Sequence, residues 1–459
     1  MTSKPVVVIG GGLAGITASV DLADRGHEVV LLESRSRLGG AAGSFERGGV
    51  RADTGQHVLL RCYTEYRGLI ERMGASSLVS IQDSMDIPVI IEGRPIARLH
   101  RGQFGPAPMH LIPAVARYGA LTPRERASAI RAARAIRSID PDDCMTDERT
   151  FGEWLRSHGQ NDRVIRRLWG LLCVAALNLT PDAASLALAA KVIQTGLLAE
   201  VSGGDIGLIQ APLSQVHDDA AARLLAHLGV TVRRGSRVTA VDQSDNGFVV
   251  RTRSDEVAAR GAVLAIPHQY AARIVPPSAI ADPDSWGGLG ASPIINTHLR
   301  FDRTVTHLPF AAAPESPVQW LFDRTSALGI KTGQYLVTST SAADSLSSAT
   351  AQQICTSQYD ALAVLLPGVR QAKVLDTFVT REPRATFRQA AGTARLRPQA
   401  QTALPGLVLA GAWTATGWPD TMEGAVRSGH VAAEVLCRSA SGSLPTNDPT
   451  GSSRREAIA

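Results

Sequence analysis

The sequence predicts an α/β fold in which a Rossmann-like domain, assembled from separate stretches of chain, carries an inserted second domain of helices and strands. Three observations support this. A strand, glycine turn, helix and second strand occupy residues 6–33, short apolar strands return after residue 224 and at 407–411, and a long region of different pattern separates them. A chain of 459 residues is long enough for two or three ordinary domains.

The first unit begins with Val6–Ile9, a short β-branched run suited to a buried parallel strand. Gly10, Gly12 and Gly15 follow it directly. In this context the first glycine permits a tight turn, the second lets backbone approach a pyrophosphate, and the third allows close helix packing. The free N–H groups of the helix then face the phosphates. The unit predicts a bound dinucleotide, the alternative being a purely structural turn.

The second strand, Val29–Leu32, ends at Glu33, eighteen residues after Gly15. A carboxylate at this point can accept hydrogen bonds from a ribose 2′-hydroxyl, and it repels a 2′-phosphate. The dinucleotide is therefore expected to be FAD or NAD and not NADP.

A second glycine turn, Gly39–Gly40, follows closely, with Arg35 and Arg37 beside it. Glycines here indicate backbone running close to the same extended ligand, with Arg35 near its phosphates, although solvated loop arginines are the alternative. Further on, the polar run from Asp53 to His57 precedes an apolar strand and suits a loop that lines a cavity.

The middle of the chain departs from the dinucleotide pattern. Residues 86–100 alternate like short strands. Thr122-Pro123 with Glu125 predicts the start of a helix that has a basic face. This face is either solvated or in contact with a membrane. Residues 150–198 are helical and strongly apolar, and Asn178 and Pro181 divide them into a helical hairpin. This hairpin is either plain core or the lining of an apolar tunnel.

Strand-rich sequence returns in the second half, in Leu224–Gln243, Phe248–Val250 and Ala262–Pro267. Near the end, LVLAG at 407–411 is followed by a helix expected over about Met422–Cys437, capped by Thr421 or Asp420. We therefore expect a discontinuous dinucleotide-binding domain of residues 1–84, 205–270 and 401–438, a substrate domain of residues 85–204 and 271–400, and a disordered tail of residues 439–459.

Composition excludes several classes of protein. The chain is 44% hydrophobic and 19% charged, which argues against disorder and against a membrane bundle. A net charge of +5 without basic blocks argues against nucleic-acid binding, and five scattered cysteines show no metal-ligand spacing. We expect a cytoplasmic protein without a signal peptide or spanning helix, and peripheral contact with the inner face of the cell membrane stays open.

Several motifs together resemble one family. GGGLAG with Glu33, the Gly39–Gly40 turn, GSRVTAV, VLAIP and the C-terminal glycine, strand and helix resemble the FAD-dependent amine oxidase and phytoene desaturase superfamily over the whole chain. DTGQHVLLRCYTE, LWGLLCVAALNLTPDAAS, REPRATFRQ and WTATGWPDTMEGAVRSG resemble its squalene-associated branch, the hydroxysqualene dehydroxylases of hopanoid biosynthesis. The resemblance implies FAD held between a nucleotide-binding domain and an apolar substrate domain.

Residue by residue, the resemblance implies these cofactor contacts: Gly10, Gly12, Gly15, Glu33, Arg35, Gly40, Val238, Gly411, Met422, Glu423, Gly424 and Ala425. Two positions depart from the family pattern. Ala41 stands where the family has an arginine and Ala412 where it has an aspartate, and Arg37 is the candidate to replace the first. A hydrogen bond to a charged group contributes ~1.5–3 kcal/mol, so FAD would be weakened and not lost.

The resemblance implies reductive dehydroxylation of hydroxysqualene to squalene on reduced flavin, with His57, Asp53 and Glu423 as candidate proton donors. Trp413, Trp418 and Trp169 could offer π faces to a cation, although core packing suits each better. The alternatives are a carotenoid-type polyene desaturase and a catalytically weakened flavoprotein that scaffolds a prenyl synthase complex. Amine oxidation is disfavoured because residues 150–200 offer no evident polar site.

With Ala41 and Ala412 in place, the first unit must carry more of the cofactor affinity. We predict that Glu33→Ala weakens FAD binding by a factor of about 10 to 100, because the carboxylate that accepts hydrogen bonds from the ribose hydroxyls is lost. The flavin absorbance of the purified variant, relative to its protein absorbance, measures this. Full FAD occupancy in the variant would contradict the role assigned to Glu33.

Overall fold

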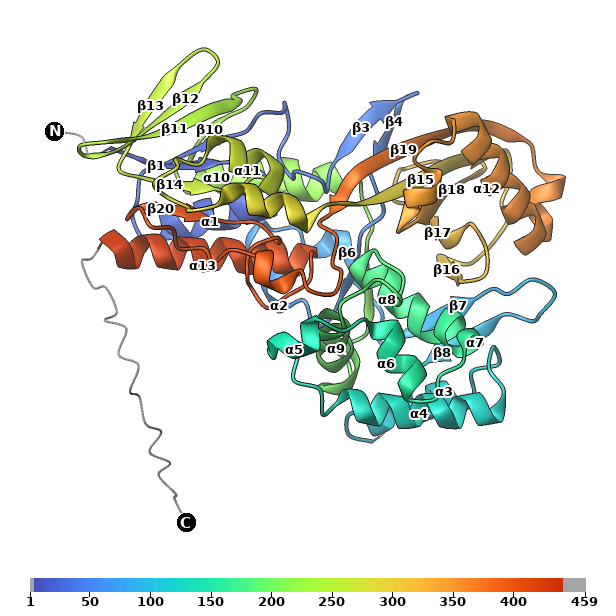
Figure 1. The fold of residues 1–459 in the computed structure, drawn as a ribbon. Coiled ribbons are helices and arrows are strands. Elements are labelled where there is room, and N and C mark those ends of the chain that lie inside the picture. The colour runs from blue at the N-terminus through green and yellow to red at the C-terminus, as the bar shows by residue number, and fades with distance from the viewer. Residues whose placement is uncertain (1–3, 104, 441–459) are drawn as a thin grey trace.

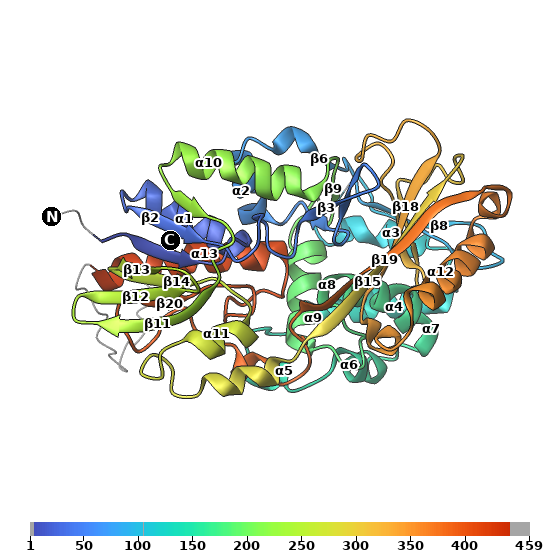
Figure 2. The ribbon, with the colours of Figure 1, turned by 90° about the horizontal axis from the view of Figure 1, so that it is seen from above.

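The computed structural model describes residues 4–103 and 105–440. It places a parallel sheet with its helices at one end of the molecule and a mixed sheet at the other (Figure 1 and Figure 2). Of the predicted tail, Ser439 and Ala440 end the last helix, and residues 441–459 lie outside the described residues.

The parallel sheet has five strands in the order β10-β2-β1-β14-β20, and every neighbouring pair is parallel. Its strands come from three distant stretches of sequence, as the returning strand pattern predicts. They are β1 (Val6–Ile9), β2 (Val29–Leu32), β10 (Thr231–Arg233), β14 (Gly261–Leu264) and β20 (Leu407–Leu409).

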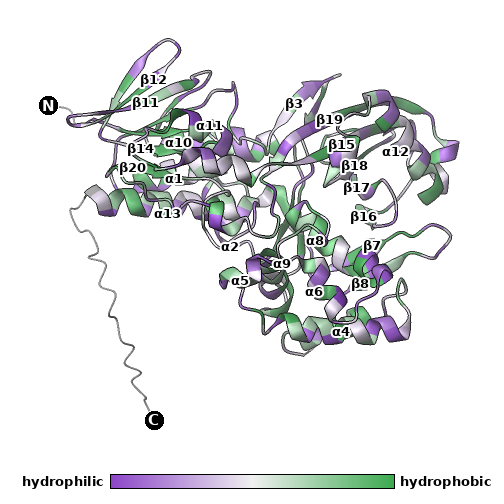
Figure 3. Ribbon diagram, in the orientation of Figure 1, coloured by the Kyte–Doolittle hydropathy of each residue, from purple (hydrophilic) through white to green (hydrophobic). Residues whose placement is uncertain are grey.

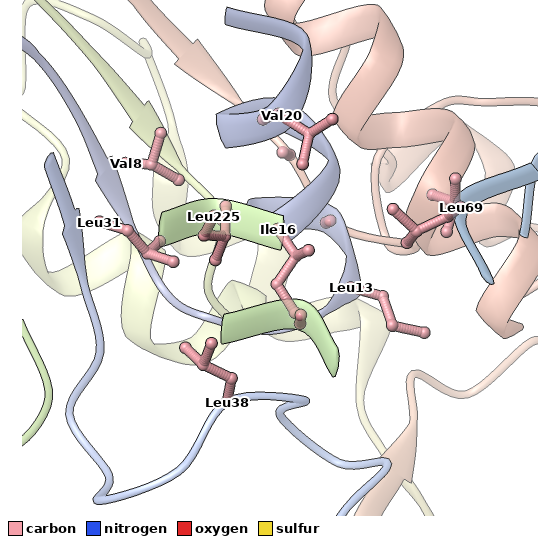
Figure 4. Packing of buried hydrophobic residues seen from close by; sticks show 14 of the residues in the cluster. Val8, Leu13, Ile16, Val20, Leu31, Leu38, Leu69 and Leu225 are labelled. Atoms are coloured by element: carbon pink, nitrogen blue, oxygen red, sulfur yellow. The ribbon is translucent and has the colours of Figure 1, made fainter. Parts of the chain in front are cut away.

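Alternate side chains of β1 enter two different cores. Val6 and Val8 pack with the helices on one face, and Val7 and Ile9 pack with an antiparallel meander on the other. The helices of the first face are α1 (Leu13–Asp24), α2 (Thr64–Arg72), α10 (Ala221–His227) and α13 (Met422–Ala440). The second face holds β11 (Val238–Ser244), β12 (Gly247–Thr252), β13 (Glu256–Ala259) and α11 (His268–Ile274). Figure 4 shows Val8, Leu13 and Leu225 gathered in the first core.

The mixed sheet has seven strands in the order β19-β15-β18-β17-β16-β7-β8. Its strands are β7 (Asp86–Val89), β8 (Ala97–His100), β15 (Ser292–Phe301), β16 (Phe310–Ala313), β17 (Gln319–Asp323), β18 (Gln334–Thr340) and β19 (Val374–Thr386), and α12 (Ala351–Leu365) packs on β19 and β15. The alternating pattern at 86–100 predicts β7 and β8.

Helices α3–α9 lie beside this sheet, and α8 is drawn mostly in the hydrophobic colour in Figure 3. Asn178 ends α8 with a φ of 53°, which reverses the chain toward α9 and confirms the predicted hairpin. The bounds are α3 (Ile112–Ala116), α4 (Pro123–Ile136), α5 (Cys144–Asp147), α6 (Phe151–Ser157), α7 (Asp162–Val164), α8 (Gly170–Leu177) and α9 (Leu186–Ile193).

Short irregular helices extend or join these elements. Three are π-helical segments that continue a longer helix: η3 (Ile165–Trp169), η4 (Gln194–Leu198) and η5 (Gln215–Ala220). The others are 3₁₀ turns: η1 (Ser76–Leu78), η2 (Met109–Leu111), η6 (Pro283–Leu289), η7 (Ala343–Leu346), η8 (Pro367–Gln371) and η9 (Ala394–Leu396).

A small antiparallel sheet and two buried ion pairs join the two ends of the molecule. The sheet, β5-β9-β6, contains β5 (Val58–Leu60), β6 (Val79–Ile81) and β9 (Ile206–Ile209). Arg324, just after β17, donates to Asp53 Oδ2 at 3.0 Å, and Arg101 donates to Asp205 Oδ1 at 2.6 Å. Removing one partner of a buried pair typically costs about 3–5 kcal/mol. These contacts therefore hold the ends in a fixed relation.

The predicted fold class is confirmed, and the predicted elements are present with ends shifted by a few residues. One hairpin was not predicted: β3 (Ser44–Arg47) and β4 (Val50–Asp53), which turn at Gly48–Gly49. The domain boundaries stay predictions. Within the described ranges, no helix is long and apolar enough to cross a membrane.

Candidate functional site

One cavity, of about 380 Å³, extends from the glycine turns of the parallel sheet to the apolar helices beside the mixed sheet. Its wall contains Gly12 and Gly39 at one end and Leu171 and Phe322 at the other. The start of α13 also contributes, through Thr421, Met422 and Ala425. A single space is therefore shared by the predicted dinucleotide site and the predicted apolar tunnel.

The three glycines of the first turn have different environments. A Cβ on Gly15 would lie 1.9 Å from the carbonyl oxygen of Gly10, and one on Gly10 would lie 2.4 Å from that of Ala265. Both glycines are required for close packing of strand and helix. A Cβ on Gly12 would meet only Gly40 Cα, at 3.9 Å, because Gly12 borders the cavity. No side chain caps α1, so its first N–H groups remain available to a ligand at this edge.

The two glycine turns touch each other, as their predicted shared ligand requires. Gly39 N–H donates to the carbonyl oxygen of Gly11 at 2.8 Å. Glu33, only 6% exposed, accepts the Gly11 N–H at 2.7 Å and the Arg35 N–H at 2.7 Å. Arg35 and Arg37 both donate to the carbonyl oxygen of Gly40, at 2.9 and 3.0 Å. Arg37 therefore lies beside the loop that carries Ala41.

The C-terminal segment closes the same end of the cavity. Thr421 Oγ1 accepts the Gly424 N–H at 3.1 Å, so the predicted capping by Thr421 is confirmed. Gly411 N–H donates to Ser428 Oγ of α13 at 2.8 Å. The buried Arg397 donates to the carbonyl oxygens of Ala412, Thr414 and Trp418, and these bonds fix the loop that leads into α13.

The other end of the cavity is apolar and aromatic. Leu171, Leu172 and Ala175 of α8 face Val192 and Ile193 of α9, with Met85 and Ile87 nearby in the wall. Phe310, Trp320 and Phe322 from β16 and β17 also line it, and their rings stack pairwise with centroids 6.3 to 6.5 Å apart. The cavity can therefore hold a long hydrocarbon against π faces.

Among the candidate proton donors, only His57 lines the cavity. Burial lowers the pKa of its imidazole, so the ring is mostly neutral at pH 7. Two carboxyl groups that were not predicted as donors also line the cavity, Glu382 and Asp420. Burial raises the pKa of Glu382, against the opposing charges of Arg35 and Arg37. Burial raises the pKa of Asp420 to about 6.

The other two candidates, Asp53 and Glu423, do not reach the cavity wall. Asp53 is 2% exposed and is engaged by Arg324, by Ser44 Oγ and by the Leu213 N–H. Glu423 is fully buried, accepts the N–H groups at the start of α2 and pairs with Arg427. Both carboxylates have structural partners, so we assign neither of them proton transfer.

The remaining predicted residues occupy positions around the cavity. Val238 begins β11, and the preceding Ser236 N–H donates to the carbonyl oxygen of Glu33 at 2.8 Å. Trp413 and Trp169 are buried in cores and donate to Ile266 and Gln160. Trp418 packs under the Arg427 guanidinium. None of these three tryptophans lines the cavity.

Comparison with known proteins decides the family. The family model described as flavin containing amine oxidoreductase matches residues 13–437. The chain belongs to the flavin-containing amine oxidoreductases. Membership implies FAD, and the cavity fits it, because Gly12, the uncapped start of α1 and the start of α13 border one space.

Two curated relatives within this superfamily are distant in sequence and similar in length. A zeta-carotene desaturase of Arabidopsis thaliana is 25% identical, with 94% of this chain and 85% of that protein covered. A hydroxysqualene dehydroxylase of Sinorhizobium fredii is 27% identical, with 94% and 98% covered. The chain is thus similar to both proteins over most of its length.

Solved structures show the same fold. A double mutant of putrescine oxidase superposes with a TM-score of 0.73 at 16% identity, covering 95% of this chain and 99% of that one. An oxidoreductase from Methanosarcina mazei superposes with a TM-score of 0.74 at 17% identity, covering 94% and 100%.

Sequence reasoning missed the aromatic wall and the two cavity carboxyl groups. Trp320 and Phe322 alternate in QWLFD, which indicates that they share one face of a strand, but their partner Phe310 follows only from the register. The position of Asp420 before the last helix indicates only a helix cap, and Glu382 lies within the REPRATFRQ motif without any local signal of a cavity.

The two glycines Gly12 and Gly15 provide a matched test of the cofactor site. Gly12→Ala should leave the thermal stability of the apoprotein unchanged within about 1 °C and weaken FAD binding at least tenfold, because its methyl group enters the cavity. Gly15→Ala should destabilise the apoprotein itself, since its methyl group collides with backbone. Calorimetry and FAD titration measure both. Wild-type FAD affinity in Gly12→Ala would show that the cofactor does not approach this glycine.

Proposed function

We propose that the protein catalyses the reductive dehydroxylation of hydroxysqualene to squalene, with FAD as the redox cofactor. The observation that carries the proposal is the single cavity that joins the glycine turns, at Gly12 and Gly39, to an apolar and aromatic pocket at Leu171 and Trp320. This arrangement suits a long hydrocarbon whose reacting carbon must lie beside a dinucleotide.

The lining of the pocket supports an isoprenoid over an amine. Leucine, isoleucine, methionine, alanine and aromatic side chains form most of the inner end. An ammonium group buried among these side chains would have a large desolvation cost, because the carboxyl groups in the wall, Glu382 and Asp420, do not belong to this apolar set. The alignment with the hydroxysqualene dehydroxylase covers 98% of that protein, which also supports a dehydroxylase function over that of other isoprenoid oxidoreductases.

The proposed reaction asks three things of this chain. It must hold the allylic carbon in position, keep water from the cation left when the hydroxyl departs, and supply a proton to that hydroxyl. The apolar walls of α8 and α9 provide the first two, with Phe310, Trp320 and Phe322 offering π faces to the positive charge. Bound reduced flavin supplies the hydride.

A polyene desaturase is the second candidate, favoured by the similarity to zeta-carotene desaturase. It would use the same cavity and withdraw hydride from a hydrocarbon. A flavoprotein that scaffolds a prenyl synthase, and peripheral contact with a membrane that supplies the substrate, are also compatible with an apolar cavity. The scaffold hypothesis is weakened because Arg37 lies beside the Ala41 loop and the cavity is bordered by both Gly12 and the start of α13.

We expect the purified, FAD-loaded protein, reduced with dithionite under anaerobic conditions, to convert hydroxysqualene to squalene. Gas chromatography with mass detection measures the product, and flavin reoxidation measures the coupled electron transfer. Free reduced FAD and the Gly12→Ala variant are the controls, because free FAD has no substrate cavity and the variant should retain less FAD.

Other outcomes separate the candidates. Dehydrogenation of a polyene such as phytoene by the oxidised protein, without squalene formation by the reduced protein, would favour the desaturase. A colourless protein that takes up no added FAD would favour the scaffold.

A further inference from the structure

We propose that Asp420 is the acid that protonates the departing hydroxyl group of the substrate. The assignment rests on the proposed dehydroxylation and names a catalytic residue within it. It follows from the position of this carboxyl group in the cavity wall and from the partners that surround it.

Asp420 lies where the cofactor end of the cavity meets the substrate end. It directly precedes Thr421 and Met422 at the start of α13, and all three line the cavity. Ala385 and Thr386, at the end of β19, also line the cavity and directly precede Phe387, which bonds to Asp420. A group at this junction can reach a substrate atom that also lies beside a flavin.

The carboxyl group is held in place by one oxygen and leaves the other available. Asp420 Oδ2 accepts the Phe387 N–H at 2.8 Å, and the Asp420 N–H donates to Gln389 Oε1 at 2.8 Å. Phe387 and Gln389 are both buried, so this support is rigid. The described part of the chain makes no hydrogen bond to Asp420 Oδ1, which is thus free to meet a substrate hydroxyl.

The surrounding charges explain why this acid retains a proton where others do not. Arg397 is the charged side chain that faces Asp420, and its guanidinium donates to the carbonyl oxygens of Ala412, Thr414 and Trp418 instead of forming an ion pair. The start of α13 also favours the ionised form. Burial outweighs the effects of Arg397 and of the helix start, and it raises the pKa of Asp420 to about 6. About a tenth of the carboxyl groups are therefore protonated at pH 7.

The other groups in the wall suit proton donation less well. Glu382 faces the positive charges of Arg35 and Arg37, which favour its carboxylate. Burial lowers the pKa of His57, so its imidazolium is scarce at neutral pH. Tyr63 also lines the cavity, and burial raises the pKa of its phenol far above neutrality.

The dehydroxylation combines proton transfer from Asp420 with hydride transfer to the allylic carbon. The allylic C–O bond breaks with its electron pair on oxygen, the oxygen takes the proton of Asp420, and water leaves. Reduced flavin, when bound, would supply the hydride and its two electrons to the allylic carbon and would itself be oxidised. The Asp420 carboxylate regains a proton from solvent before the next turnover. The sum of these changes is that one alcohol, one hydride and one proton give one hydrocarbon and one water.

The test compares Asp420→Asn with the wild-type holoenzyme on two substrates, hydroxysqualene and the allylic fluoride that replaces its hydroxyl. General acid catalysis contributes a factor of about 10² to 10⁴, so kcat on the alcohol should fall at least 100-fold. The fluoride leaves without a full proton transfer, so its kcat should stay within about tenfold of wild type. FAD affinity should be unchanged. Asp255→Asn, at an exposed carboxylate in the turn between β12 and β13 that does not line the cavity, is the control and should behave as wild type.

The pH profile gives a second readout. Because the protonated form is the active one, wild-type kcat on the alcohol should be constant below about pH 6 and fall tenfold per pH unit above it. The fall in kcat above this pH should be absent when the allylic fluoride is the substrate. Equal losses on both substrates, no loss on either, or loss of FAD from Asp420→Asn would overturn the assignment. A wild-type enzyme inactive on both substrates would instead overturn the proposed function and the assignment with it.

Discussion

The carboxylate of Glu33 is the interaction on which the cofactor end of this molecule depends. It is buried, and it accepts backbone N–H groups from Gly11 in the first glycine turn and from Arg35 in the segment leading to the second. Hydrogen bonds to a charged group are about twice as strong as neutral ones, so this residue sets the spacing of the two turns. The backbone that would hold a pyrophosphate is therefore arranged before any ligand arrives.

The substrate end depends on contacts between stretches of chain that are far apart in sequence. Arg324, after β17, reaches Asp53 at the end of β4 and the carbonyl oxygens of Ile209 and Ala211 near β9. These bonds join the mixed sheet to the segment that carries His57 into the cavity. The apolar pocket and the glycine turns form one space because this joint is rigid.

Local patterns in the sequence predict much of this architecture, since they depend on neighbouring residues. The β-branched run Val6–Ile9 with its glycines, and the break at Asn178, each predict the element that the structure contains. The candidate acids could not be sorted in this way. Asp53 is neutralised by an arginine 271 residues away, and Asp420 is held at the cavity by the N–H of Phe387, 33 residues earlier in the chain. Cavity walls depend on such long-range contacts, which no local pattern encodes.

The central claim is that a flavin and a long hydrocarbon share one cavity, and a crystal structure of the FAD-loaded protein with bound squalene tests it most directly. We expect the flavin between Gly12 and the start of α13, with the hydrocarbon continuing past Asp420 between α8, α9 and the stacked rings of Phe310, Trp320 and Phe322. Squalene bound outside this cavity, or a cavity between α8 and α9 filled by side chains in the holoprotein, would contradict it.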